Sequence, residues 1–391
     1  NLVRTVDALG NTTSIEYTAT TARFKERMSD PNQGPWTYSY DALGQLKTQT
    51  DAKNQLTTLI YDVLGRLIEK QNPTQNSTWY YDKTAAGAWC AAGLNRLCES
   101  KAGRVGEPDI SRQVHTYDPL GRPLQTATTI DRTYSTEITY DTLGRTQSLR
   151  YATGLTVQYG YSTAAADRIA GVLERVFDAA PGGSVFWSVA NAPAQAFDAR
   201  GNLLRADLGN GLSTNHAFDA ISGKAFNLRT GSAAGGYVSA LDHRYEYDKA
   251  SNVVKRTEAI NALVEDFGYD KLNRLTHHAI VSGSDAGANR SVLVGYNAIG
   301  NIQSKSDVGG YAYASNRPHA VASAGGTSYA YDANGQMESS SGNQARTQSW
   351  TAFNQPLAMS YRGRSVAFLY DHDYKRVRET FIDGSTNTQR T

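Results

Sequence analysis

One seven-residue pattern recurs along this chain and constrains its fold more than any other feature. Its reference copy is Tyr61-Asp62-Val63-Leu64-Gly65-Arg66-Leu67, and the tightest matches begin at Tyr117 and Tyr140. Looser copies begin at Tyr40, Phe197, Tyr269, Tyr296 and Tyr331. A repeat this pervasive sets the architecture before any local feature does.

Each copy predicts a strand, a turn and a second strand. Residues before the aspartate alternate, as in Trp36-Thr37-Tyr38-Ser39-Tyr40, and period-2 alternation with aromatics indicates a half-buried strand. The aspartate can accept hydrogen bonds from the backbone that follows it. The glycine takes positive φ without a Cβ clash, and Asn273 occupies the same position in one copy.

A second, weaker turn lies between copies, so that turns recur every 10 or 11 residues. The first series of turn positions is Asp30, Asp41, Asp51, Asp62, Asn72 and Asp82. The last series is Asp332, Asn343, Thr351, Gly363 and Asp371. This spacing leaves strands of roughly 5 to 8 residues and favours an all-β fold of tandem antiparallel hairpins over a β-helix or a propeller.

We interpret residues 1–391 as a single hairpin array and a fragment of something larger, with two degenerate or inserted segments at 83–116 and 162–196. In the second segment, Ile169, Val172, Leu173 and Val176 have helical spacing, yet a drifted repeat explains them as well; we favour strands. Cys90 and Cys98 are either two unrelated thiols or a disulfide across a hairpin, the latter in an oxidising compartment.

Composition excludes some classes of partner. A net charge of +2 gives no electrostatic footprint for nucleic acid or a membrane surface. No run of 18 apolar residues occurs, so we expect no membrane span. We see no signal peptide before the first repeat copy.

The recurring Tyr-Asp-x-x-Gly-Arg-Leu unit resembles the YD repeat of bacterial Rhs proteins, of the B and C components of Tc toxins and of teneurins. The resemblance covers nearly the whole chain and is weakest at 83–116 and 162–196. It implies that the hairpins form a spiralling strip, part of a hollow shell that encloses a C-terminal toxin domain. Roughly 30 strands at about 4.8 Å would give a strip about 140 Å long, or a turn or so of such a wall.

We expect no catalytic, cofactor-binding or metal-binding residues. Asp118-Pro119 and Asp30-Pro31 look like the self-cleavage signature of the family but lie in ordinary repeat turns. His277-His278 would point to opposite faces of a strand. Asp371-His372-Asp373 has the residue types of a metal site but falls on the repeat register. We expect the repeat arginines to pair with repeat aspartates on the neighbouring hairpin; they are Arg66, Arg122, Arg145 and Arg274.

Three functions remain open from the sequence. The first is a structural, non-enzymatic shell segment of a secreted or cell-surface bacterial toxin, with a passenger polypeptide, the remaining shell and delivery components as partners. The second is a carbohydrate-binding or adhesion module that uses some of the 24 tyrosines. The third is a polysaccharide-acting enzyme on a β-scaffold. Tyrosines buried as ladders between hairpins would favour the first over the second.

Overall fold

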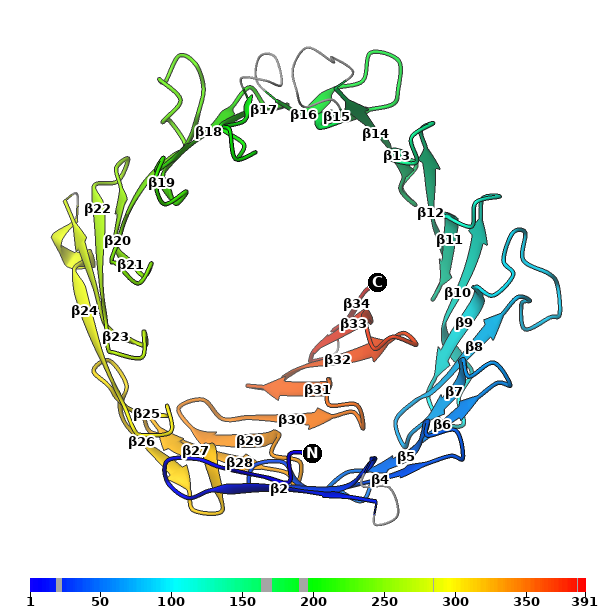
Figure 1. The fold of residues 1–391 in the computed structure, drawn as a ribbon. Helices are drawn as coiled ribbons and strands as arrows, with labels where there is room; N and C mark the ends of the chain where they lie inside the picture. Colours follow the sequence, from blue (N-terminus) through cyan, green and yellow to red (C-terminus); the bar gives the residue numbers. More distant parts are fainter. Residues whose placement is uncertain (19–22, 163–170, 190–195, 284, 385) are drawn as a thin grey trace. The chain divides into compact units, whose positions relative to one another are not determined.

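The fold is all-β. The computed structural model describes residues 1–18, 23–162, 171–189, 196–283, 285–384 and 386–391, and these contain 34 strands, drawn in Figure 1. One short 3-10 helix, η2 (Ala286–Ala288), follows β23. No helix among the described residues is both long enough and apolar enough to cross a bilayer.

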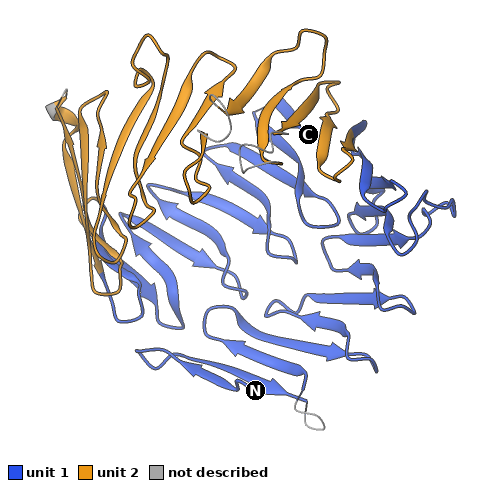
Figure 2. Ribbon diagram, turned by 45° about the horizontal axis from the view of Figure 1, so that its top comes forward, with its two compact units in different colours: residues 1–135, 296–304, 308–391 blue, residues 136–295, 305–307 orange. Residues whose placement is uncertain are grey.

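The chain divides into two compact units, coloured separately in Figure 2. Unit 1 comprises residues 1–135, 296–304 and 308–391, and unit 2 comprises residues 136–295 and 305–307. Unit 1 therefore combines the beginning and the end of the chain.

Unit 1 contains two runs of strands. The first run, which we call the N strip, is β1 (Arg4–Val6), β2 (Thr12–Tyr17), β3 (Lys25–Asp30), β4 (Gly34–Tyr40), β5 (Leu46–Thr50), β6 (Leu56–Tyr61), β7 (Leu67–Gln71), β8 (Asn76–Tyr81), β9 (Leu97–Gly103), β10 (Asp109–Tyr117) and β11 (Pro123–Thr129). The second run, the C strip, is β26 (Gly309–Ala314), β27 (Arg317–Ala324), β28 (Thr327–Tyr331), β29 (Met337–Gly342), β30 (Arg346–Trp350), β31 (Pro356–Tyr361), β32 (Arg364–Tyr370), β33 (Arg376–Asp383) and β34 (Thr386–Arg390).

Unit 2 contains the strands between them. They are β13 (Thr146–Arg150), β14 (Thr156–Tyr161), β15 (Leu173–Asp178), β16 (Val185–Val189), β17 (Arg205–Leu208), β18 (Ser213–Phe218), β19 (Ala225–Gly231), β20 (Leu241–Tyr247), β21 (Val253–Glu258), β22 (Leu263–Tyr269) and β23 (Leu275–Ser282). The unit boundaries fall within β12 (Thr133–Tyr140), β24 (Arg290–Tyr296) and β25 (Ile302–Lys305).

Each strand pairs antiparallel with its neighbours in the chain wherever a register is given. The β6–β7 pair is typical: Thr58 lies opposite Gln71, and the register shifts by one residue at Tyr61, which lies opposite Leu67. A bulge next to a residue at positive φ is the usual end of a three-residue hairpin loop. The tandem-hairpin prediction is therefore confirmed.

The repeat turn forms as its sequence predicts. Asp62 Oδ1 accepts the backbone N–H of Leu64 and of Arg66, both at 2.9 Å. The Gly65 N–H donates to the Asp62 carbonyl, and Gly65 has a φ of 79°. Asn273 occupies the corresponding position with a φ of 58°. The same aspartate-centred geometry recurs in the intermediate turn at Asp51, whose left-handed residue is Asn54.

The turn positions of both series fall at strand ends or between strands. The predicted 10- to 11-residue spacing is confirmed in the first series, whereas positions of the last series are 8 to 12 residues apart. The strand interpretation of the ambiguous segment is confirmed at β15 and β16. Ile169 and the alanines before it lie outside the described residues.

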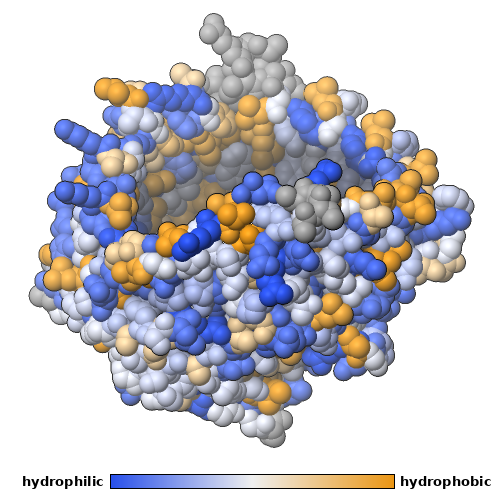
Figure 3. Space-filling model, turned by 60° about the horizontal axis from the view of Figure 1, so that its bottom comes forward, coloured by the Kyte–Doolittle hydropathy of each residue, from blue (hydrophilic) through white to orange (hydrophobic). Residues whose placement is uncertain are grey.

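Burial in this fold is more polar than in an ordinary core. Trp36, Trp79 and Phe368 are among the buried apolar residues, but Ser77, Ser100 and Ser111 are each at most 1% exposed. The face shown in Figure 3 likewise mixes hydrophilic and hydrophobic side chains in small patches. Side-chain hydrogen bonds therefore hold many of the buried residues in place.

Candidate functional site

The repeat tyrosines form a ladder between successive hairpins. Tyr61 donates its hydroxyl to the Leu46 carbonyl, the first residue of the return strand of the preceding hairpin, at 3.0 Å. Nine further tyrosines make the same kind of bond, each to a carbonyl 10 to 22 residues earlier: Tyr17, Tyr40, Tyr117, Tyr161, Tyr247, Tyr269, Tyr313, Tyr331 and Tyr370. Each of these bonds links the segment that carries the tyrosine to the preceding part of the array.

Burial raises the pKa of the ladder tyrosine Tyr61 above its ordinary value, and the nearby Asp41 carboxylate acts in the same direction. The phenol therefore stays protonated and remains a donor. One copy lacks both the tyrosine and the aspartate, yet keeps the geometry. Trp350 Nε1 donates to the Met337 carbonyl at 2.9 Å, and Thr351 Oγ1 accepts the Gln355 N–H at 3.0 Å.

The prediction that repeat arginines pair with an aspartate of the neighbouring hairpin is confirmed for Arg66, but the partner common to all four lies in the arginine's own turn. Each guanidinium binds the aspartate of its own turn, four residues earlier, at 2.6–2.7 Å; the pairs are Arg66–Asp62, Arg122–Asp118, Arg145–Asp141 and Arg274–Asp270. The reason is local: backbone N–H groups occupy Oδ1, and Oδ2 remains free for the arginine.

Two of these arginines also lie against a tyrosine ring of the next hairpin. The Arg66 guanidinium lies 4.5 Å from the centroid of the Tyr81 ring, and Arg145 lies 4.1 Å from that of Tyr161. Arg66 also reaches a neighbouring repeat aspartate, Asp82, at 3.0 Å. At Arg66 and Arg145, an arginine and a tyrosine thus join one hairpin to the next.

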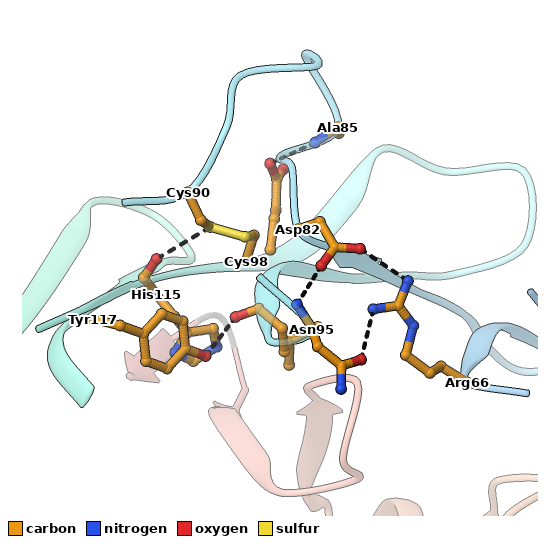
Figure 4. Close-up of a disulfide and its surroundings, with 10 residues drawn as sticks. Arg66, Asp82, Ala85, Cys90, Asn95, Cys98, His115 and Tyr117 are labelled. Carbon is orange, nitrogen blue, oxygen red and sulfur yellow. Dashed lines mark hydrogen bonds and ion pairs between the residues drawn. A yellow bond between two sulfur atoms is a disulfide. The ribbon is translucent and has the colours of Figure 1, made fainter. Parts of the chain in front are cut away.

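The segment after Asp82 is a repeat turn with extra residues inside it (Figure 4). The Asp82 N–H donates to the Arg96 carbonyl, as the Asp62 N–H does to that of Arg66, and Asp82 Oδ1 accepts the N–H of Asn95. Asn95 has a φ of 60°, in the position that Gly65 holds elsewhere. The motif is thus completed by Leu94-Asn95-Arg96-Leu97, and residues 84–93 are accommodated between its two halves.

A disulfide between Cys90 and Cys98 ties this inserted loop to β9, with a Cα–Cα distance of 5.9 Å (Figure 4). Gly93 lies against it, and a Cβ at that position would come within 2.1 Å of the Cys90 Cβ. Glu99, with a side chain 1% exposed, receives the Ala85 N–H at 3.0 Å and an ion pair from Arg112 at 2.7 Å. The loop is therefore held to β9 by the disulfide and by the Ala85 hydrogen bond, and the ion pair ties Glu99 to β10.

The C strip packs against the N strip along a seam. One group of contacts joins the turns at Asp51 and Asp332. Lys53 Nζ forms an ion pair with Asp332 Oδ2 at 2.8 Å, and Asn334 Nδ2 donates to Asp51 Oδ2 at 2.7 Å. Asp51, Asp332 and Asn334 are all at least 94% buried. Next to them, Arg317 Nη1 donates to the Asn32 carbonyl.

A second group of contacts lies where the turn at Asp371 meets the face of β8–β10. Trp79, Ser100 and Gln113 lie side by side on that face. His372 Nδ1 is 3.0 Å from Ser100 Oγ, and its ring meets Trp79 edge-on. Gln113 Nε2 donates to Asp371 Oδ2 at 3.3 Å.

Between these groups the seam is closed by an aromatic stack. Tyr374 lies 3.8 Å from Phe353, centroid to centroid, and Lys70 Nζ lies 4.5 Å from the Tyr374 centroid. Burial raises the pKa of Tyr374 to about 12 and lowers that of Lys70. The hydrogen bonds along the seam join residues 258 to 302 positions apart in the chain.

A cavity of about 390 Å³ lies at one end of the seam. Trp36, Asn32, Asn334 and Gln336 are among its lining residues. Asn334 Oδ1 and Gln336 Oε1 are buried, and no partner for them is found within the described part of the chain. The cavity is thus rich in amides and contains one indole.

The other residues considered from the sequence have structural partners. Asp371 and His372 belong to the seam, and no group of three or more His, Cys, Asp or Glu residues suited to a metal occurs within the described ranges. His278 pairs with Glu265 at 3.1 Å, and His277 with Ser291 at 3.1 Å. Asp118 and Asp30 accept backbone N–H groups of their own turns. Sequence reasoning missed Lys53, Ser100 and Gln113, because nothing in the local pattern marks them.

Comparison with known proteins agrees with this geometry. The family described as RHS Repeat matches residues 40–78. Those residues are similar to an RHS repeat. The search of curated proteins finds no match.

Solved structures of Tc toxins have the same fold. The chain matches a crystal structure of TcdB2–TccC3–Cdc42 with a TM-score of 0.62 and 14% identity, over 96% of this chain and 22% of that one. It matches the Tc holotoxin pore of Photorhabdus luminescens, with a TccC3 mutation, with a TM-score of 0.64 and 15% identity over the same shares. A TcdB2–TccC3 structure gives 0.62 and 14%, over 99% of this chain and 23% of that one. The chain therefore has the fold of a segment of the Tc toxin proteins and spans under a quarter of their length.

Proposed function

We propose that this chain is wall material of an Rhs/Tc-type toxin shell and encloses a passenger polypeptide of the same parent by steric sequestration. The observation that carries the proposal is the seam. Hydrogen bonds between residues 258 to 302 positions apart hold the turns of the C strip against the N strip. A wall made of one spiralling strip needs this kind of layer-to-layer contact.

The tyrosine ladder supports the same proposal. It repeats one hydrogen bond from hairpin to hairpin, as in Tyr61 to Leu46 and Tyr269 to Val253. A contact shared by successive hairpins stiffens a continuous sheet, whereas a catalytic or binding site concentrates distinct groups at one place. A lumen without a unique site would hold its cargo by exclusion alone.

The proposal also covers the extent of the array, its partners and its location. The whole of residues 1–391 would be one array interrupted at 83–116 and 162–196. Its partners would be the passenger, the remaining shell and delivery components, and its location the exterior or surface of a bacterium. The chain itself would not be an enzyme.

Carbohydrate binding is the second candidate. The ladder argues against carbohydrate binding through the tyrosines, because the hydroxyls of ten of them donate to backbone carbonyls. The 390 Å³ cavity at the seam, with Trp36 and several amides, is the one observation in its favour. Calorimetric silence across a broad glycan panel would remove this candidate.

The test of the shell proposal uses the parent polypeptide with a C-terminal epitope tag. We expect the tagged passenger to resist protease in the wild type and to become sensitive in the double variant Asn334→Arg/His372→Arg, which places two guanidinium groups in the buried seam. The matched control is Asn210→Arg, in an exposed turn. A passenger cleaved equally fast in wild type and seam variant would contradict enclosure. A cryo-EM map of the parent with an empty interior would contradict it independently.

A further inference from the structure

The cavity of about 390 Å³ at the end of the seam, which we call the seam cavity, contains two hydrogen-bond acceptors that the fold does not use. Asn334 Oδ1 and Gln336 Oε1 are buried, and neither has a partner within the described residues. Both residues line the cavity, and Asn334 is only 6% exposed. A buried acceptor without a partner destabilises the fold, so this pair favours a ligand that donates hydrogen bonds.

Contacts with neighbouring side chains hold both amides in place. Asn334 Nδ2 donates to Asp51 Oδ2 at 2.7 Å, and because a carboxylate only accepts, this amide cannot exchange its nitrogen and its oxygen. Gln336 Nε2 donates to Asn354 Oδ1 at 2.9 Å, which leaves the Gln336 oxygen unused. The two free acceptors are therefore a preformed feature of the seam, held by contacts to the N strip and within the C strip.

The seam cavity also has an apolar wall. Trp36 lines it and is 9% exposed, and its Nε1 donates to the Gln33 carbonyl at 3.3 Å, which holds the indole in one orientation. Ala320, another lining residue, is equally buried. A ligand that fits this cavity therefore has an apolar face for the indole in addition to its hydrogen-bond donors.

Charge and size narrow the class of ligand further. None of the described residues that line the seam cavity is Asp, Glu, Lys or Arg, so an ionic ligand would lose its hydration without meeting a counter-charge. Three lining residues, Gln33, His319 and Asn354, are exposed and mark the mouth of the cavity. Since small-molecule sites typically measure about 300 to 1,000 Å³, this cavity suits one small ring rather than a chain of them.

We propose that the seam cavity binds a single neutral pyranose unit of a glycan. Two of its hydroxyls donate to Asn334 Oδ1 and Gln336 Oε1, and the C–H face of its ring lies against Trp36. A pyranose combines the required features, because it is uncharged, its hydroxyls are donors, and one face of its ring is apolar. The inference rests on carbohydrate binding, the second candidate function, and gives it a site and a ligand size. It does not depend on whether the chain encloses a passenger.

Saturation-transfer difference NMR on the full chain tests this with four probes: the methyl glycosides of glucose, galactose and mannose, and N-acetylglucosamine. We expect at least one probe to bind with a Kd of about 1 mM, as suits so small a ligand. Gln336→Leu removes one acceptor and should weaken that binding about three- to tenfold. The matched control is Gln45→Leu, at the same motif position of the turn at Asp41, where Nε2 donates to the Gly65 carbonyl at 3.0 Å. It should bind like the wild type.

A second variant, Ala320→Phe, fills the seam cavity and leaves the polar side chains of the seam unchanged, so it should abolish binding. If it folds poorly, the comparison of Gln336→Leu with Gln45→Leu still decides.

Three results would overturn the inference. Silence of all four probes on the wild type is the first, and the second candidate function then falls only if larger glycans are silent too. Binding that persists undiminished in Gln336→Leu and Ala320→Phe is the second, since it places the sugar elsewhere and leaves carbohydrate binding standing. The third is an equal signal from acetamide, which donates hydrogen bonds but has no apolar ring face.

Discussion

Lys53 and Asp332, 279 positions apart in the chain, form an ion pair of 2.8 Å across the seam. The Asp332 side chain is 3% exposed and that of Lys53 is 26% exposed. The carboxylate is therefore nearly removed from water, and the lysine is its link to the other strip.

Replacing this lysine should loosen the seam. Lys53→Met leaves a buried carboxylate without its cationic partner, which we expect to cost about 1–3 kcal/mol. Hydrogen exchange of residues 332–336 should speed up accordingly, whereas the exposed control Lys47→Met should leave it unchanged. The double variant Lys53→Met/Asp332→Asn should recover part of the loss, because no charge is then stranded. Additive losses in that cycle would mean that the pair contributes nothing as a pair.

Removing one hydroxyl of the tyrosine ladder should destabilise its hairpin. Tyr61→Phe deletes the 3.0 Å bond to the Leu46 carbonyl and keeps the ring, so we expect a loss of about 0.5–1.5 kcal/mol. Urea unfolding followed by tryptophan fluorescence measures it. Tyr151→Phe, at a tyrosine 41% exposed, is the control. Equal stability of Tyr61→Phe and wild type would show that the ladder is incidental to folding.

The sequence predicts the repeat turns, the tyrosine ladder and the seam to different degrees. The repeat itself fixes the turns: an aspartate that accepts backbone N–H groups and a glycine at positive φ determine where each strand ends, as at Asp62 and Gly65. The tyrosine and arginine partners are not predictable from one copy, because they lie on the adjacent hairpin. The sequence does indicate that 83–116 begins with an interrupted repeat turn, because Leu94-Asn95-Arg96-Leu97 completes the motif that starts at Tyr81-Asp82.

The seam lies beyond any local pattern. Ser100 meets His372 across 272 positions, and no periodicity in either segment indicates the other. Local hydrogen-bond chemistry determines the hairpin, whereas the curvature of many hairpins in series determines which distant turns meet. Small changes in twist between neighbouring strands accumulate along an array, so the partner of a given turn cannot be deduced from its own residues.

The left-handed turn position should penalise a Cβ. Gly10 has a φ of 85°, and a Cβ added there would meet nothing within 4 Å, so Gly10→Ala tests backbone strain alone. We expect a loss of about 1–2 kcal/mol. Asn273→Gly, at a φ of 58°, should be close to neutral. The free energy of unfolding from urea titration compares the two, and a neutral Gly10→Ala would refute the strain argument.

Reducing the disulfide should affect the inserted loop and leave the strands intact. The Cys90–Cys98 bridge closes a short loop, and its loss should cost about 2–3 kcal/mol of local stability. We expect limited proteolysis to cut within residues 84–96 after mild reduction or in Cys90→Ser/Cys98→Ser, with the far-UV circular dichroism unchanged. A global loss of β-structure on reduction would instead make the bridge essential to the array.

The seam should weaken in mild acid because of His372. Burial lowers the pKa of this imidazole below its ordinary value of 6.5, although Asp373 and Asp371 oppose the shift and Lys375 adds to it. Burial likewise lowers the pKa of His115, with a further contribution from His372. Since the folded pKa is the lower one, the unfolded chain binds protons first as the pH falls through 6.5. Stability is therefore fully present above 6.5 and is lost below it.

Thermal melting at pH values of about 7.5 and about 5.5, on either side of the ordinary imidazole pKa, measures this loss. His372→Asn keeps a polar group opposite Ser100 Oγ and cannot be protonated, so its melting temperature should fall less than that of the wild type over the same interval. His319→Asn, at a histidine exposed to solvent, should retain the wild-type pH dependence. If His372→Asn and wild type lose stability equally between the two pH values, the acid sensitivity resides elsewhere and the buried imidazole does not govern the seam.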